Sequence, residues 1–271
     1  MPDALSPFLN AIENADSATS LSDAVQALAD ACLVESISHL IEALSYNNPG
    51  AAVAAVDGLI NLGEPAVPAL LEQLDLNNYT ARSWAIRALA GIGDPRGLMT
   101  LLGAATADIS MSVRRAAARG LGQMKWHLFP PNLLDIAQSE AFDALLFVAQ
   151  QDEEWVVRYA AVVGLESLAL APQSRKNTRR QQIEKHLDKI SQREESITVR
   201  ARIQKAQQYL QEAVPLVEAS LTLEEPSSLS STDWEQILER LYNRKLRERT
   251  VSEGDPKHFK QLLDVAQIQR S

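Results

Sequence analysis

The stretch ARSWAIRALAGIGDP, residues 81–95, repeats in outline the stretch AAVAAVDGLINLGEP, residues 51–65. Aligning Leu59 with Leu89 superposes the glycine and the proline that follow each leucine, which gives the repeat a period of 30 residues. A period of this length is typical of arrays in which each copy is one supersecondary unit. Further copies are SVRRAAARGLG at 112–122 and VVRYAAVVGLESL at 156–168, and weaker ones are SDAVQALADA at 22–31 and TVRARIQKAQQYL from 198.

Each unit is expected to form a motif helix, a short turn and a second helix. In the unit that begins at residue 81, apolar side chains recur at helical spacing up to Ile92. Gly93 can supply the left-handed conformation that ends a helix, and Pro95 prevents its continuation. A second apolar stripe begins at Leu98. Because neither helix buries its stripe alone, the pattern predicts an all-α, HEAT-like α-solenoid, a right-handed superhelix of stacked helix pairs.

The pattern divides the chain into three parts. About five to six repeats are expected to form a solenoid over residues 1–214. Residues 215–232 contain serine and proline and are expected to be a linker. Residues 233–271 are a helical C-terminal extension, with an amphipathic helix from Trp234 and a short helix after Asp255. The extension is expected to fold back onto the solenoid or to dock on another protein.

Two charged positions recur with the repeat. An arginine stands near the start of each motif helix, and an aspartate precedes two of these helices. We expect them to pair between neighbouring repeats, because an aspartate near a helix N-terminus caps it and a partly buried arginine needs a partner. This reading is favoured over ligand binding. The arginines are Arg82, Arg114, Arg158 and Arg200, and the aspartates are Asp108 and Asp152.

Two segments interrupt the repeat. They are KWHLFPPNLLDIAQSEAF at 125–142 and the polar, basic SRKNTRRQQIEKH at 174–186. Insertions in a solenoid tend to lie at one rim, where loops meet binding partners. We therefore expect these segments to contact a partner.

Composition restricts the classes of function. The chain has 26 basic and 35 acidic residues, net −9, so we expect neither nucleic-acid nor anionic-membrane binding. With no transmembrane segment and no targeting signal, a cytoplasmic protein is expected. No metal site is expected, because no Cys/His set has zinc spacing. Cys32, among aliphatic residues on an expected helix, is read as an inert core residue. The common phosphate-binding and nucleophile motifs are absent, which favours a binding scaffold.

Aromatic residues stand near arginines in the motif helices. Trp84 lies three positions before Arg87, and Trp155 three positions before Arg158, which is followed by Tyr159. Core packing is the simpler reading of the tryptophans, because large aromatics at repeated positions commonly fill gaps between helices. The alternative is a concave surface that binds a flat, conjugated dicarboxylate by stacking and bidentate salt bridges.

Four strings carry a resemblance to a known family. They resemble the smaller, F-type or β subunit of the cyanobacterial E/F-type phycocyanobilin lyases, over about residues 1–214, and they are far more specific than a general HEAT pattern. Residues 215–271 have no place in that family pattern. The strings are YNNPGAAVAAVDGLI at 46–60, ARSWAIRALAGIGDPRGL at 81–98, MSVRRAAARGLG at 111–122 and EEWVVRYAAVVGL at 153–165.

The resemblance implies a HEAT-repeat subunit that works as a heterodimer with an E-type (α) subunit. The heterodimer attaches phycocyanobilin through a thioether to a cysteine of the phycocyanin α subunit, in phycobilisome biogenesis. The reactive thiol then belongs to the acceptor, phycocyanobilin is the substrate, and no cofactor is bound permanently. A place peripheral to the thylakoid or phycobilisome is compatible with this role. A His-Cys motif marks relatives that also isomerise the bilin; this chain has none, so attachment without isomerisation is expected.

The resemblance also suggests where a bilin would bind. Arginines on the concave face would hold the two propionates, and a carboxylate such as Asp57 or Glu154 would face the pyrrole nitrogens. A non-catalytic HEAT-repeat adaptor or chaperone for a phycobiliprotein or another client remains the alternative, and a scaffold for metal-cluster assembly is poorly supported by one cysteine. The candidate bilin-binding residues are Trp84, Arg87, Arg115, Trp155, Arg158, Tyr159 and Asp57.

Overall fold

The computed structural model describes residues 4–72, 74, 78–172, 178–212 and 229–250. Over these residues the chain forms helices joined by turns and contains no strand, so the all-α prediction is confirmed. Contacts divide the chain into two units, residues 1–226 and 227–271, which are described separately. The second unit contributes α13 (Ser231–Thr250), which contains the predicted amphipathic helix. The short helix predicted after Asp255 lies outside the described residues.

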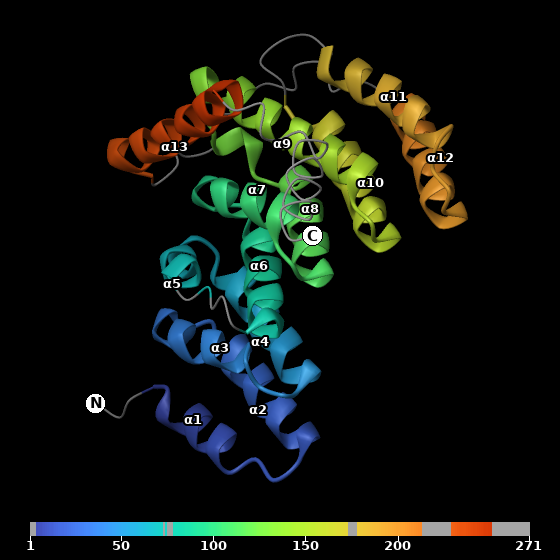
Figure 1. Cartoon of the computed structure of the whole chain (residues 1–271). Coiled ribbons are helices and arrows are strands. Elements are labelled where there is room, and N and C mark those ends of the chain that lie inside the picture. The colour runs from blue at the N-terminus through green and yellow to red at the C-terminus, as the bar shows by residue number, and fades with distance from the viewer. Residues whose placement is uncertain (1–3, 73, 75–77, 173–177, 213–228, 251–271) are drawn as a thin grey trace, which may run out of the picture. The chain divides into compact units, whose positions relative to one another are not determined.

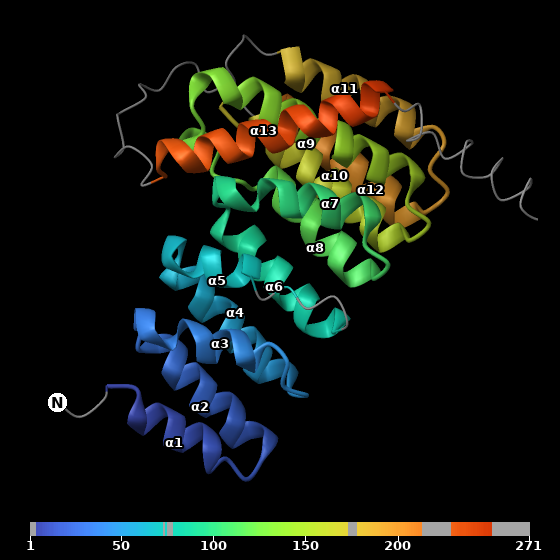
Figure 2. The same ribbon diagram turned by 60° about the vertical axis from the view of Figure 1, so that its left-hand side comes forward.

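The first unit consists of two rows of helices (Figures 1 and 2). The helices that carry the repeated motif form one row, which we call the motif row, and the helices between them form the companion row. The motif row contains α2 (Ala18–Asp30), α4 (Pro49–Leu62), α6 (Tyr79–Ile92), α8 (Met111–Gly122), α10 (Trp155–Leu170) and α12 (Ile197–Glu212). The companion row contains α1 (Ser6–Glu13), α3 (Ile37–Ala43), α5 (Val67–Glu72), α7 (Leu98–Ala107), α9 (Pro131–Gln151) and α11 (Thr178–Ser191).

Glycines end two of the motif helices as the sequence predicts. Gly93 closes α6 in the left-handed conformation, with φ 69° and ψ 20°, and Gly63 closes α4 with φ 71°. Pro95 then opens a short 3-10 turn that leads into α7. The chain therefore reverses within a few residues, which places α7 next to the motif row.

The motif helix is the second helix of its pair, whereas the repeat pattern predicts it as the first. In the middle of the stack, α8 packs mainly on the preceding α7, and α10 packs more on α9 than on α11. The period of a repeat is the same whichever helix is counted first. The sequence pattern therefore could not show which neighbouring helix pairs with the motif helix. The packing of the helices determines it.

Neighbouring helices of the motif row approach each other through alanine and glycine. A Cβ atom added to Gly122 of α8 would lie 2.1 Å from the carbonyl oxygen of Gly164 in α10. One added to Gly120 would lie 2.3 Å from the Cβ of Ala90 in α6. Helices of the companion row make fewer contacts with one another. A stack bends toward its more closely spaced row, so the exposed side chains of the motif row face the inside of the bend.

Arginine–carboxylate pairs link successive motif helices, as predicted. Nε of Arg82 lies 2.7 Å from Oδ2 of Asp108, and Nε of Arg114 lies 2.6 Å from Oδ2 of Asp152. The series continues with Arg158, whose Nη2 lies 2.7 Å from Oε1 of Glu194. We call this series the ladder. The aspartate pattern did not predict the last acid of the ladder, because a glutamate, Glu194, replaces the aspartate there.

Each ladder carboxylate also holds the loop that precedes the next motif helix. The backbone N–H of Ser110 donates to Oδ1 of Asp108 over 2.8 Å, and that of Ser196 donates to Oε1 of Glu194 over the same distance. Arg114 and Arg158 in turn donate to carbonyls of their own loops, as Nη1 of Arg114 does to the carbonyl of Asp108 over 3.0 Å. The ladder therefore fixes both the helix stack and the loops along one edge.

The two interruptions of the repeat are folded rather than loop-like in the described residues. Trp126 and Phe129 are buried with ring centroids 5.2 Å apart, and most of the first interruption forms the N-terminal half of α9. In the second, Nη2 of Arg179 donates to Oγ of Ser139 over 3.0 Å and its guanidinium lies over the Phe142 ring. In the described residues these segments are therefore largely helical and add to the core, and their contact with a partner stays a prediction.

Candidate functional site

Five of the seven predicted ligand residues lie along the exposed face of the motif row, on α4, α6, α8 and α10. Asp57, Arg87 and Arg119 occupy the same position of the repeat on α4, α6 and α8. Arg115 and Tyr159 occupy another common position, one helical turn earlier, on α8 and α10. Residues at equivalent positions of stacked helices lie side by side. We call Asp57, Trp84, Arg87, Arg115, Arg119 and Tyr159 the motif-face set.

Trp84 and Arg87 form a cation–π pair on this face. The guanidinium carbon of Arg87 lies 5.3 Å from the centroid of the Trp84 indole. Trp84 is half-buried and Arg87 is exposed, so the tryptophan partly fills the helix interface and keeps one part open. A planar anionic ligand could therefore contact the indole and the guanidinium together.

Two further arginines extend this positive region along α8. Arg115 and Arg119 stand four residues apart, so both lie on the same face of the helix. Both are exposed, and neither forms an ion pair with another residue in the described part of the chain. Arg115 was a predicted ligand residue and Arg119 was not, although their i, i+4 spacing in MSVRRAAARGLG indicates that they act together. Paired guanidinium groups without carboxylate partners suit a dicarboxylate.

Tyr159 continues the face onto α10 but is held by a neighbouring arginine. The guanidinium carbon of Arg202 lies 5.9 Å from the Tyr159 ring centroid, and its Nη1 lies 2.8 Å from Oε2 of Glu166. Arg202 is buried, so this contact ties α12 to α10. The tyrosine ring is thereby fixed at the end of the positive region.

The other two predicted ligand residues belong to the first turn of α10, where Trp155 stands four residues before Tyr159 on the same helix face. Arg158 belongs to the ladder, where Nε and Nη2 bind Glu194 and Nη1 donates to the carbonyls of Asp152 and Glu153. Trp155 is the first residue of α10 and 46% exposed, so it does not fill the core. Its position at the helix start places it on the edge formed by the ladder loops.

The ion pair between Arg158 and Glu194 shifts the pKa of both groups. The hydrogen bond from Arg158 holds the pKa of Glu194 below its ordinary value, with the Ser196 N–H and the charges of Arg158 and Arg200 acting in the same direction and burial opposing them. The same bond raises the pKa of Arg158. Both groups therefore remain charged and committed to each other at neutral pH.

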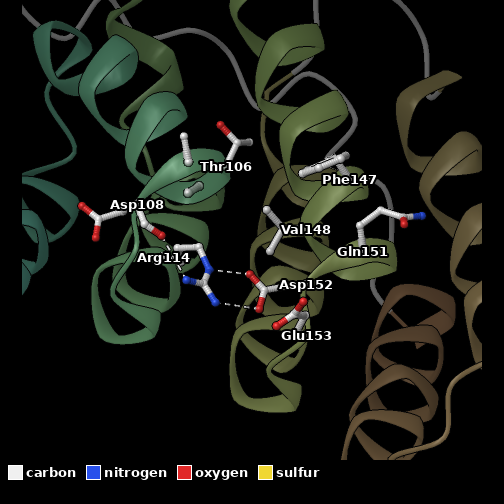
Figure 3. Close-up of a pocket in the computed structure, with 10 residues that line it drawn as sticks. Thr106, Asp108, Arg114, Phe147, Val148, Gln151, Asp152 and Glu153 are labelled. Carbon is white, nitrogen blue, oxygen red and sulfur yellow. Dashed lines mark hydrogen bonds and ion pairs between the residues drawn. The ribbon is translucent and has the colours of Figure 1, made fainter. Parts of the chain in front are cut away.

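Two cavities open along the ladder. The first, shown in Figure 3, has a volume of about 270 Å³ and lies between the loops that precede α8 and α10, with Phe147 and the Arg114–Asp152 pair in its wall. The second, of about 580 Å³, is lined by residues that include His186, Lys189 and Glu194. The Nδ1 atom of His186 is buried without a hydrogen-bond partner. Neither cavity contains a member of the motif-face set.

Cys32 differs from its predicted placement. It is exposed and follows the end of α2 with φ 49°, rather than lying in the core of a helix. Among the described residues, no group of three or more His, Cys, Asp and Glu side chains is arranged to hold a metal ion. Within the same residues, no helix combines the length and apolar character needed to cross a membrane.

Comparison with known proteins agrees with the fold and defines the class. The family model for HEAT repeats matches residues 67–166. A chain in the structure of the complex of CpcE and CpcF of phycocyanin lyase from Nostoc sp. superposes with a TM-score of 0.60 at 45% identity, covering 65% of this chain and 99% of that chain. The protein is therefore a HEAT-repeat protein.

Full-length relatives define the family more narrowly. The phycocyanobilin lyase subunit beta of Pseudanabaena tenuis is 58% identical over 273 residues, which cover 97% of each chain. The subunit of the same name from Nostoc sp. is 46% identical, covering 74% of this chain and 97% of its own. The chain belongs to the family of phycocyanobilin lyase β subunits. The Pseudanabaena match is too long to omit residues 215–271, so the C-terminal extension has a counterpart in the family.

Proposed function

We propose that this protein is the β subunit of a heterodimeric lyase that attaches phycocyanobilin to a cysteine of the phycocyanin α subunit. The observation that carries the proposal is the match along almost the whole chain to a phycocyanobilin lyase β subunit. A second relative, from Synechocystis sp., is named phycocyanin alpha phycocyanobilin lyase CpcF and is 51% identical over 60% of this chain. The partner is an E-type subunit, as in the related complex from Nostoc sp..

The motif-face set supports the binding half of this function. Phycocyanobilin is an open-chain tetrapyrrole with two propionates. Arg87, Arg115 and Arg119 offer guanidinium groups to the propionates, and the half-buried Trp84 offers an aromatic surface to a pyrrole ring. Exposed Asp57, one helix away, would face the pyrrole nitrogens and stabilise a protonated ring system. Arg158 is assigned to the ladder and not to the bilin.

The chemical step requires no nucleophile from this chain. The thiol of the acceptor adds across the ethylidene double bond of ring A, so that sulfur bonds to the exocyclic carbon and the proton goes to the ring carbon. Atoms and electrons balance without an oxidant or reductant. The lyase therefore contributes by orienting the bilin and presenting the ethylidene carbon to the thiol. Because His-Cys is missing from the sequence, the double bonds of the attached bilin are expected to stay where this addition leaves them.

Co-expression tests the proposal. The full chain, an E-type subunit and the phycocyanin α subunit are produced together in cells that make phycocyanobilin, and the denatured acceptor is scored by zinc-induced fluorescence. We expect covalent, red-absorbing acceptor only when both lyase subunits are present. Replacing the acceptor cysteine by serine should abolish the signal.

Omission experiments separate a lyase subunit from an adaptor. If the chain is a lyase subunit, omitting either subunit reduces attachment to the spontaneous rate. If the acceptor is folded or stabilised by this chain alone, while attachment is no faster than spontaneous addition with all components present, the chain is an adaptor or chaperone and the proposal is wrong.

A further inference from the structure

A row of exposed apolar side chains follows the ladder across four successive repeats. Each side chain belongs to the first residue of a motif helix, a position where water and not the core surrounds it. We call these four residues the apolar row. They are Tyr79, Met111, Trp155 and Ile197, and they are 62%, 50%, 46% and 76% exposed.

The ladder keeps the apolar row in line. Each member stands three residues before a ladder arginine or its equivalent, so Met111 lies one helical turn from Arg114 and Trp155 one turn from Arg158. Arg114 is bound to the loop ahead of Trp155 through Asp152, 2.6 Å away. The Arg82–Asp108 and Arg158–Glu194 ion pairs, each with a nitrogen–oxygen distance of 2.7 Å, hold the loops ahead of α8 and α12 in the same way. Row members on neighbouring helices are therefore held at the same edge of the stack.

Chance exposure does not account for the row. Isolated exposed hydrophobic residues are common on protein surfaces. In the described part of the chain, however, eight large apolar side chains are well exposed, and four of them share one position of the repeat. A fifth, Ile109, is 96% exposed in the loop just before Met111. Exposed apolar side chains that recur along one edge of the stack mark an interaction surface.

The exposed charged residues beside the apolar row indicate which charge the partner surface carries. The carboxylates of the ladder are neutralised by their arginines, whereas Glu153, Glu154 and Glu195 are exposed and form no ion pair with another described residue. Arg193 is exposed nearby and only partly offsets them. A second copy of this chain would bring like carboxylates together, which is unfavourable. The edge instead fits a different chain that carries apolar and basic side chains.

We infer that the apolar row is the surface on which the E-type subunit docks, an inference that rests on the proposed function. The related chain seen in the CpcE–CpcF complex covers 65% of this chain. The second unit has only 45 residues, so most of that match lies in the first unit, where the row is found. Heterodimer interfaces have an apolar centre, and aromatic and Met side chains are enriched there. Trp155 and Ile197 supply such a centre, and the three glutamates form an acidic rim.

The test is the affinity of full-length variants for the E-type subunit, measured by calorimetry without bilin or acceptor. The variant Trp155→Ser/Ile197→Ser removes two exposed members of the row and leaves the core intact. We expect its dissociation constant to rise at least about 30-fold, as for hot-spot residues. The matched control, Val34→Ser/Tyr209→Ser, alters two comparably exposed residues outside the row, at 55% and 52%, and should bind within about twofold of the unmodified chain.

Three results would overturn the inference. The first is a row variant that binds the E-type subunit as tightly as the control does. The second is an unmodified chain that does not bind the E-type subunit at all. The third is self-association of the unmodified chain that the row variant loses, since the occupant would then be a second copy.

Charge variants test the acidic rim separately. Glu153→Gln/Glu154→Gln should slow association with the E-type subunit and reduce its salt dependence, because rim charges act mainly on the association rate. An unchanged association rate would contradict a basic partner surface.

Failure of docking and failure of the proposed function give different results. A tight heterodimer that attaches no bilin contradicts the lyase function alone, whereas a row variant that still binds the E-type subunit tightly and still attaches bilin contradicts the docking surface alone.

Discussion

Arg158 of one repeat and Glu194 of the next form a bidentate ion pair, with Nε–Oε2 and Nη2–Oε1 distances of 2.8 and 2.7 Å. The side chains are only 16% and 3% exposed. Arg158 also donates to two backbone carbonyls of its own loop. The pair therefore connects two helices and two loops with one guanidinium group.

Replacing Arg158 by alanine should destabilise the protein strongly. The change leaves Glu194 buried without its counter-ion, which costs about 3–5 kcal/mol in comparable pairs. Chemical denaturation should report this loss in the free energy of unfolding. Lys205→Ala, at an exposed position of α12, serves as the control and should stay within about 0.5 kcal/mol. An equal effect of both substitutions would show that the ladder does not support the stack.

Acid should weaken the same pair. The pKa of Glu194 lies below its ordinary 4.5 in the folded protein. A lowered carboxylate pKa means that its contribution to stability is fully present above pH 4.5 and is lost as the pH falls through the folded pKa. The unfolding free energies of the unmodified protein and Glu194→Gln should therefore differ by about 1–3 kcal/mol at pH 7 and converge in acid. A difference that stays constant down to pH 3 would be inconsistent with this titration.

Close packing of the motif row predicts opposite effects of two glycine substitutions. Gly122→Ala places a methyl group 2.1 Å from the Gly164 carbonyl oxygen, so α8 and α10 must separate, at a cost of about 1–3 kcal/mol or more. Gly103→Ala in α7 meets no atom within 4 Å and should stabilise the protein by about 0.5–1 kcal/mol through helix propensity. Melting temperatures of the two variants test this directly. A Gly122→Ala protein that melts at or above the temperature of Gly103→Ala would refute the close approach.

The repeat made most of the solenoid predictable from sequence. Leu59 and Leu89 fixed the period, and Gly93 fixed a helix end, because each reflects a local requirement of backbone or periodicity. The phase of the pairs was not predictable, since it depends on which neighbour α8 packs against. Glu194 was not predicted, because the residue type at its position is not repeated. Its role follows only from the distance to Arg158 in the neighbouring repeat.

The candidate site was predictable only in part. Arg87 and Trp84 were expected to act together because they are close in sequence, and the structure places them 5.3 Å apart. Arg158 and Trp155 have the same sequence spacing, yet Arg158 binds Glu194 and Trp155 lies at the edge of the stack. The difference arises from position within the helix: Trp155 is the first residue of α10, whereas Trp84 is the sixth of α6.

The chain should not carry the bilin covalently, even though Cys32 is exposed. The proposed reaction uses the acceptor thiol, so Cys32→Ser should attach phycocyanobilin at the rate of the unmodified protein. Mass spectrometry of this chain after turnover should find no bilin adduct. A folded Cys32→Ser protein whose attachment rate falls more than about tenfold, a loss of about 1.4 kcal/mol in transition-state stabilisation, would assign the thiol a role in the reaction.

The central claim is that the arginines of the motif face hold the bilin propionates, and an absorbance titration of the heterodimer with phycocyanobilin tests it most directly. Arg115→Ala/Arg119→Ala removes two exposed guanidinium groups that form no ion pair with the described residues, so heterodimer formation should persist. We predict that the dissociation constant for phycocyanobilin rises about 10- to 100-fold, the loss of one charge-assisted pair of hydrogen bonds. Lys185→Ala, at an exposed position of α11 in the companion row, should bind within about twofold of the unmodified heterodimer. An unchanged dissociation constant for the double arginine variant would contradict the account.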